Sequence, residues 1–187
     1  MKKLLLMGMI VAAIGCRSTT RYGRQHEAMI SSTNTAPVTS MSSRDIAGVM
    51  DAANNGEIQQ AQAALPHLTS QETRDFANMM ISDHTMALGE ASTVFSTNHI
   101  VARNSSGQAA MLRDQSKRII STLNNSGSSA DRVYIQSQVD VHQGLLTLLD
   151  SQLIPSAHND LLNMLQKQRS TVAAHLDRAR QILATMP

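Results

Sequence analysis

Apolar residues recur every three or four positions through most of the chain from residue 43 onwards, which is the spacing of one face of an α-helix. Five segments carry this pattern: residues 44–65, 71–96, 108–123, 130–153 and 159–185. Pro66 and Pro155 each follow a segment, and Ser70 can cap the start of another. The pattern therefore predicts an all-α domain over residues 43–187.

Four of these segments are long, and the remaining one, residues 108–123, lies between the second and third long segments. Long amphipathic helices with one long connection are typical of a ferritin-like four-helix bundle, in which residues 108–123 form a helical crossover between helices two and three. The composition favours helices over sheets, because aromatic residues make up only 2% of the chain while Met occurs 12 times.

The two halves of this domain resemble each other around two histidines. An aromatic residue lies eight positions before each of them, Phe76 before His84 and Tyr134 before His142. Eight residues make a little over two helical turns, so each aromatic residue shares a face with its histidine. The repeat predicts paired helical hairpins with histidines on their apolar faces, and His175 lies on a similar face of the last segment.

The start of the chain has the three parts of a secretory signal. Lys2 and Lys3 precede an apolar run over residues 4–14, which is too short to span a bilayer as a mature helix. The tetrapeptide AIGC that ends at Cys16 resembles a bacterial lipobox, which implies removal of residues 1–15 and acylation of the cysteine with chains such as palmitate. The alternative is a plain signal peptide whose cysteine happens to lie near the cleavage site.

Residues 16–42 are rich in Ser and Thr, lack apolar periodicity and are expected to tether the domain to the membrane through lipidated Cys16. Removing residues 1–15 takes away two of the 16 basic residues and leaves 14 basic against 14 acidic residues. Because no basic run remains, nucleic acid is not an expected partner. Arg17, in place of the aspartate associated with inner-membrane retention, favours the periplasmic side of the outer membrane.

Three ordered motifs carry a resemblance to a known family: FANMMISDH, DRVYIQSQVDVH and VAAHLDRA. Together they resemble the bacterial exported ferritin-like proteins of domain of unknown function family 4142, over residues 44–183. The family's motif residues fall on Asp83, His84, Asp131, Tyr134, His142 and His175. Ala130 stands where the family has an aromatic residue and Ser170 where it has a proline. The resemblance implies a ferritin-like bundle in the envelope and no established reaction.

A di-iron centre of the ferritin type is not expected. Such centres take glutamates from two helices and a Glu-x-x-His motif from each of the other two, because two irons need several anionic ligands. The residues three positions before the histidines are Ile81, Val139 and Val172. A ferroxidase or oxygen-activating di-iron activity is therefore not expected, and no enzyme activity is predicted.

A smaller metal site remains a hypothesis. If they meet at one level of the bundle, His84, His142, His175 and Glu57 offer three imidazoles and a carboxylate, a set that suits a single Zn, Cu or Fe ion. The residues expected to support these ligands from an outer shell are Asp83, Asp140 and Tyr134. The alternative is that each histidine is a buried polar residue satisfied by a carboxylate or by the Tyr134 hydroxyl of a neighbouring helix.

These observations predict an exported, lipid-anchored helical bundle of the bacterial envelope. Its predicted role is non-enzymatic: either an association with stress or the binding of an unknown envelope protein. The main alternative is a periplasmic metal-binding bundle that uses His84, His142 and His175. An enzyme of mononuclear metal chemistry is a third class.

Overall fold

The structure is a computed structural model and describes residues 40–186, so the predicted signal peptide, Cys16 and the tether up to residue 39 lie outside the described residues. The elements in chain order are α1 (Ser43–Ala64), η1 (Leu65–His67), α2 (Gln71–Thr97), α3 (Gly107–Asn124), η2 (Gly127–Ser129), α4 (Ala130–Leu148), η3 (Leu149–Leu153), α5 (Ile154–Ser156) and α6 (Asn159–Thr185). Every regular element of residues 40–186 is helical, which confirms the predicted class. Within the same range, no helix combines the length and apolarity needed to cross a bilayer.

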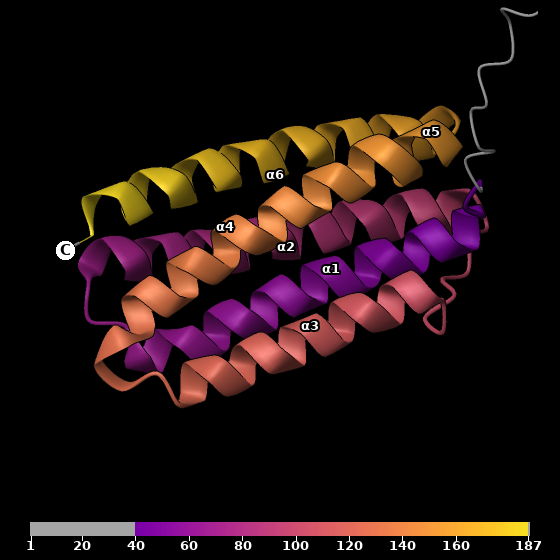
Figure 1. Ribbon diagram of the computed structural model, residues 1–187. Coiled ribbons are helices and arrows are strands. Elements are labelled where there is room, and N and C mark those ends of the chain that lie inside the picture. Colours follow the sequence, from indigo (N-terminus) through magenta and orange to yellow (C-terminus); the bar gives the residue numbers. More distant parts are fainter. Residues whose placement is uncertain (1–39, 187) are drawn as a thin grey trace, which may run out of the picture. The chain divides into compact units, whose positions relative to one another are not determined.

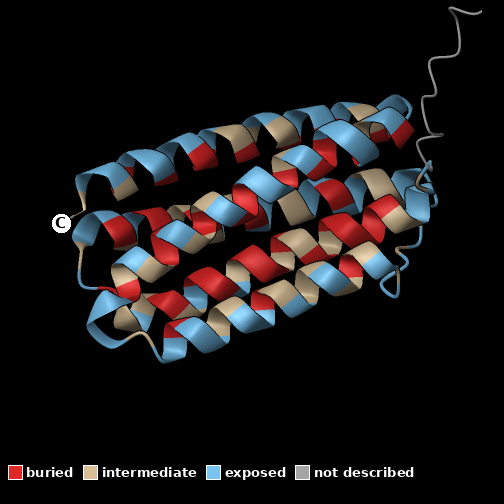
Figure 2. Ribbon diagram, in the orientation of Figure 1, coloured by how far each residue is buried: buried red, intermediate tan, exposed pale blue. Residues whose placement is uncertain are grey.

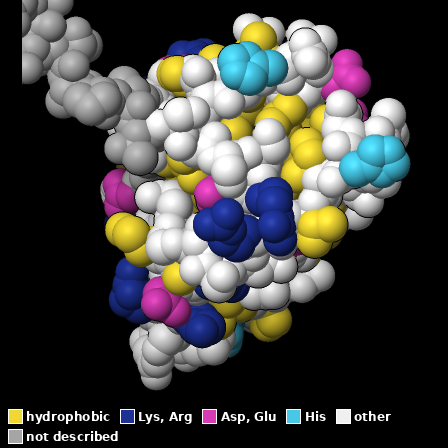
Figure 3. Space-filling view, turned by 90° about the vertical axis from the view of Figure 1, so that its right-hand side faces the viewer, with side chains coloured by type: hydrophobic (Ala, Val, Ile, Leu, Met, Phe, Trp, Pro, Cys, Tyr) yellow, Lys and Arg dark blue, Asp and Glu magenta, His cyan; other side chains and the backbone are white. Residues whose placement is uncertain are grey.

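The helices pack lengthwise into a bundle (Figure 1). Helix α1 lies against α2 and α3, α4 lies against α6, and α2 also contacts α6. Helices α1, α3 and α6 run in one direction and α2 and α4 in the other (Figure 1). The predicted crossover segment is thus α3, a helix of 18 residues that packs along α1. At the end of the bundle shown in Figure 3, basic, acidic and histidine side chains are mixed with apolar ones.

Serine side chains start three of the helices, as the sequence predicts for α2. Ser42, Ser70 and Ser106 each accept a hydrogen bond from a backbone N–H of the following first turn. These bonds satisfy N–H groups that have no partner within the helix. Asp131 of α4 adds a second restraint, because its carboxylate accepts hydrogen bonds from the backbone of Thr69 and of Ser70 at the start of α2.

The pKa of Asp131 reflects these contacts. Partial burial raises it, but the hydrogen bonds from Thr69, Ser70 and Thr73 outweigh burial, and the pKa lies below its usual value. One of the residues that the family resemblance points to therefore holds the start of α2 against α4.

The third long segment, residues 130–153, differs from its prediction. Instead of one helix over residues 130–153, α4 ends at Leu148 and continues as a π-helical turn over Leu149–Leu153. This turn directly precedes the short helix that contains Pro155. Proline has no N–H to donate to the carbonyl four residues earlier, so a regular α-helix cannot continue through this position.

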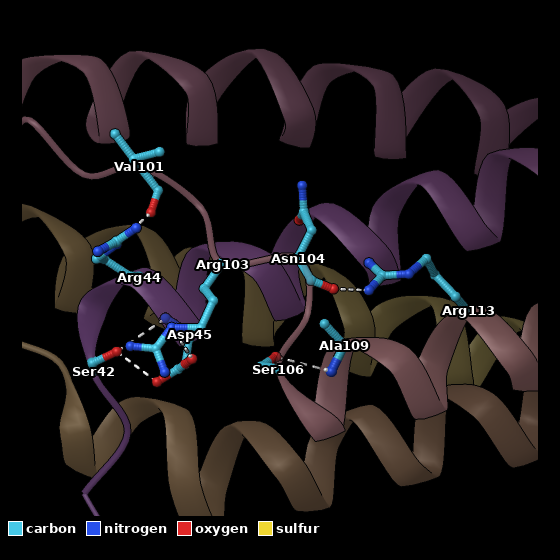
Figure 4. Close-up of polar contacts among 9 residues, drawn as sticks. All are labelled: Ser42, Arg44, Asp45, Val101, Arg103, Asn104, Ser106, Ala109 and Arg113. Atoms are coloured by element: carbon cyan, nitrogen blue, oxygen red, sulfur yellow. Dashed lines mark hydrogen bonds and ion pairs between the residues drawn. The ribbon is translucent and has the colours of Figure 1, made fainter.

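The loop between α2 and α3 is fixed to the first turns of α1 (Figure 4). The Arg103 N–H donates to the carbonyl of Arg44 at 2.7 Å, and its guanidinium forms an ion pair with Asp45 at 3.3 Å. A Cβ atom at Gly48 would overlap the carbonyl oxygen of Arg103, so this close approach requires glycine. The loop thereby sets the position of α3 beside α1.

The inward faces of the helices are buried along their whole length (Figure 2), but the core is not uniformly apolar. One apolar cluster includes Ile46, Val49, Leu149 and Leu165, and a second includes Phe76, Met80, Tyr134 and Ile182. Buried polar residues also lie along α1, α2, α4 and α6. Seven of them are here called the polar layer: Asn54, Glu57, Gln60, His84, Gln138, His142 and His175. The candidate site lies in this layer.

Candidate metal centre

Three histidines from three helices meet inside the bundle. His84 comes from α2, His142 from α4 and His175 from α6, and their side chains are 4%, 0% and 3% exposed. Each offers one ring nitrogen such that the three nitrogens lie within 4.8 Å of one another. The ring centroids are 5.4 to 6.1 Å apart. The sequence-based hypothesis that these histidines meet at one level is consistent with this geometry.

Hydrogen bonds fix the protonated nitrogen on two of the rings. The Nδ1 atom of His142 lies 2.8 Å from the backbone carbonyl oxygen of Gln138, and Nε2 of His175 lies 2.9 Å from a carboxylate oxygen of Asp83. Carbonyl and carboxylate oxygens only accept hydrogen bonds, so each of these ring nitrogens must carry the proton. In a neutral ring the other nitrogen then presents a lone pair.

His84 is oriented by Asn54 of α1. The Nδ1 atom of His84 lies 2.8 Å from Oδ1 of Asn54, while the Asn54 amide nitrogen donates to the Met50 carbonyl at 2.8 Å. The second bond sets which end of the amide faces the histidine, so Oδ1 accepts and Nδ1 of His84 carries the proton. All four helices of the bundle core therefore contribute to the polar layer at the histidines.

One nitrogen on each ring has no hydrogen-bond partner among residues 40–186: Nε2 of His84, Nε2 of His142 and Nδ1 of His175. The hydrogen bonds of the opposite nitrogens make each of these a lone-pair acceptor. Buried acceptors without partners cost free energy, and three of them on adjacent rings are unusual in a folded core. A single cation bound between the rings would satisfy all three together.

The histidines are electrostatically suited to bind a cation. Burial, and then the neighbouring His142 and His175, lower the pKa of His84 well below its usual value. Burial and His175 lower the pKa of His142 to about 4, although the hydrogen bond to the Gln138 carbonyl raises it somewhat. Both rings are therefore neutral at pH 7, which is the form that binds a metal ion without first losing a proton.

Glu57 does not belong to the group of three histidines. It lies three residues beyond Asn54 on α1, is 1% exposed and hydrogen-bonds with the Gln138 side chain. Burial raises its pKa to about 8, only partly offset by that hydrogen bond, so the side chain is mainly protonated at pH 7. On α1, Asn54 hydrogen-bonds to a histidine, whereas Glu57 hydrogen-bonds to Gln138.

Of the three residues predicted to support the ligands, Asp83 hydrogen-bonds to a histidine, and Asp140 and Tyr134 have other surroundings. Asp83 holds His175, as expected for an outer-shell acceptor. Asp140 is exposed and accepts a hydrogen bond from Gln136 on its own helix. The Tyr134 ring packs against Phe76 at a centroid distance of 6.2 Å, and its hydroxyl has no hydrogen-bond partner in the described part of the chain. Burial, followed by the nearby Glu57, raises the pKa of Tyr134 well above its usual value.

Two supporting groups were missed by the sequence analysis. Asn54 lies four positions after Met50 and therefore on the apolar stripe of its helix. Because Asn is a poor residue for a helix interior, its place on this stripe could have indicated a buried polar contact. The other group is the main-chain carbonyl of Gln138. Every residue has such a carbonyl, so no sequence signal distinguishes it.

A pocket of about 300 Å³ between α2 and α6 reaches the histidine site. Asp83, His84 and Asn54 all line it, so it adjoins one candidate ligand and two of the groups that hold the ligands. Lys167 and Glu90, which form an exposed ion pair between α6 and α2, line it further out. A group of three histidines of which one lines a pocket resembles metal sites that keep an open coordination position.

Comparisons with known proteins place the chain in a family. Residues 28–182 match the model of a family described as Domain of unknown function (DUF4142). This confirms the resemblance to that domain family read from the three sequence motifs. No curated protein and no solved structure matches the chain.

Proposed function

We propose that this chain, which belongs to the DUF4142 family, binds a single transition metal ion through His84, His142 and His175. The observation that carries the proposal is the arrangement of the rings. One nitrogen of each histidine is committed to Asn54, the Gln138 carbonyl or Asp83, and the other is buried without a partner among the described residues. Histidines that serve only helix register are expected to have both ring nitrogens paired in the core.

The donor set selects the class of ion. Three neutral imidazoles suit Zn, Cu or Fe, whereas Ca and Mg prefer oxygen ligands. Nitrogens bound to one tetrahedral Zn²⁺ at about 2.0 Å lie about 3.3 Å apart. The three histidine nitrogens, within 4.8 Å of one another, would therefore each move towards the ion by no more than about 1 Å.

The surroundings of the histidines favour one ion over two. Ile81, Val139 and Val172 occupy the positions that would need to be glutamates in a di-iron centre. Glu57 is the only buried acidic residue within residues 40–186, and its raised pKa favours the neutral form. We therefore propose a site for one metal ion. We also propose that the fold is a ferritin-like bundle, because four helices contribute inward-facing groups near one level. The proposed role is metal binding or buffering without catalysis.

The cellular setting is a separate part of the proposal. The basic start, the short apolar run and the AIGC sequence ending at Cys16 support export and lipid anchoring on the periplasmic side of the outer membrane. Labelling with a radioactive fatty acid tests the anchor. Label retained after Cys16→Ala would refute it.

Equilibrium dialysis against Zn²⁺ tests the metal site. The wild type is expected to bind one equivalent, and His142→Ala should weaken binding by more than about 100-fold, because loss of an outer partner alone costs about 10–100-fold. His158→Ala removes an exposed histidine from the same chain and should bind as the wild type does. Circular dichroism of the metal-free variants checks that each one folds. Equal zinc binding by the wild type and His142→Ala would refute the proposed site.

A further inference from the structure

The pocket between α2 and α6 touches three groups of the histidine site. It is lined by His84 itself, by Asn54, which orients that ring, and by Asp83, which holds His175. Two other pockets, one near Phe95 and one near Asp131, touch none of these residues. A third reaches Asn54 and His84 but has a volume of only about 20 Å³ and is otherwise lined by apolar side chains.

The charges along this pocket suit a cation. Its ionisable lining residues other than His84 are Asp83, Glu90 and Lys167, two acidic and one basic, so its formal charge is negative. A concave surface with one excess sign of charge concentrates counter-ions and speeds their capture.

The His84 ring forms part of the pocket wall, between the pocket and the buried nitrogen of that ring. Its free nitrogen has no exposed surface, although the ring lines the pocket. The ring is held on one side by its hydrogen bond to Asn54. Neither His142 nor His175 lines the pocket, so an ion in the pocket meets the His84 ring before it meets the other two rings.

We infer that this pocket is the passage through which a divalent transition metal ion reaches and leaves the three histidines, with Asp83 and Glu90 attracting the ion and His84 receiving it first. The inference rests on the proposed metal site and adds its route and its first ligand. The same charges would disfavour an anionic chelate, so the ion is expected to enter free or bound to a weak neutral ligand.

Zinc transfer to and from a chromophoric chelator, followed by stopped flow, tests the passage. Ala87 is a partly buried pocket residue on α2, so Ala87→Trp should obstruct the pocket without removing a ligand. Uptake and release should both slow by at least about tenfold, with an unchanged dissociation constant, because a barrier on the route changes rates and not the end states. The matched control is Ser92→Trp, on the same helix but beside a different pocket.

A charge variant keeps the test decisive if Ala87→Trp fails to fold. Glu90→Lys reverses the excess charge of the pocket at an exposed position, and should slow zinc uptake several-fold at low salt and much less at high salt. Glu72→Lys, on the same helix and outside this pocket, is its control.

Two failures are distinguishable. A wild type that takes up no zinc refutes the metal site itself. A wild type that takes up zinc no faster than folded Ala87→Trp, or no faster than Glu90→Lys at low salt, retains the site but overturns this passage.

Discussion

Glu57→Gln is expected to stabilise the metal-free protein increasingly as the pH rises, by about 4 kcal/mol more at pH 8 than at pH 4.5. The side chain is buried and its pKa in the folded protein is raised to about 8, against 4.5 for an ordinary glutamate. Between these values the folded state keeps a proton that the unfolded state has lost. The free energy of unfolding of the wild type therefore falls through this window, whereas glutamine, a neutral side chain of similar shape, has no proton to lose.

Urea unfolding of both proteins at several pH values between 4.5 and 8 measures this effect as a difference, so that other titrating groups cancel. That matters because the histidines act in the opposite direction. The pKa of His142 is lowered to about 4, so its contribution to stability is present above pH 6.5 and is lost as the pH falls towards 4. A difference between Glu57→Gln and the wild type that does not change with pH would contradict the buried, protonated state of Glu57.

Zn²⁺ at about 1,000 times its dissociation constant should raise the free energy of unfolding of the wild type by about 4 kcal/mol. For a domain of this size the unfolding midpoint should rise by roughly 10 °C. The stabilisation arises because the ion binds three side chains from α2, α4 and α6 that come together only in the folded bundle. Differential scanning calorimetry with and without Zn²⁺ measures both quantities.

The same scan on variants separates the site from unspecific zinc binding. His142→Ala should lose most of the shift, and His158→Ala, which lacks an exposed histidine, should keep it. Mg²⁺ should give no comparable shift, because it prefers oxygen ligands. An equal zinc shift in His142→Ala would place the ion elsewhere on the protein.

The histidines were predictable because each repeats the helical spacing of its apolar neighbours. His84 lies four residues after Met80 and His142 eight after Tyr134, which places each on the inward face of its helix. Inward faces of adjacent helices must meet, so buried histidines on three helices had a good chance of approaching one another. The all-helical class followed from the same spacing.

The spacing of apolar residues alone could not predict which residue of α1 hydrogen-bonds to His84. Asn54 and Glu57 both face inward and lie about one turn apart, and the level at which each meets α2 depends on how far α1 is shifted along the bundle. That shift is set by tertiary contacts such as the approach of the Arg103 carbonyl to Gly48. Periodicity specifies the face of a helix and leaves its axial position open.

Asp140 illustrates a different limit. A carboxylate two residues before His142 is an apparent outer-shell acceptor, but neighbours at this spacing point to different sides of a helix. The ring instead bonds to the carbonyl of Gln138, one turn earlier on the same helix. Side-chain patterns do not show such main-chain acceptors.

X-ray absorption at the zinc edge of the dialysed, zinc-loaded protein is the most direct measurement of the central claim, the three-histidine site. The account predicts a first shell that contains three imidazole nitrogens at about 2.0–2.1 Å together with one water oxygen, and loss of bound zinc in His142→Ala. A first shell made only of oxygen, or one whose imidazole scattering is unchanged in His142→Ala, would contradict it.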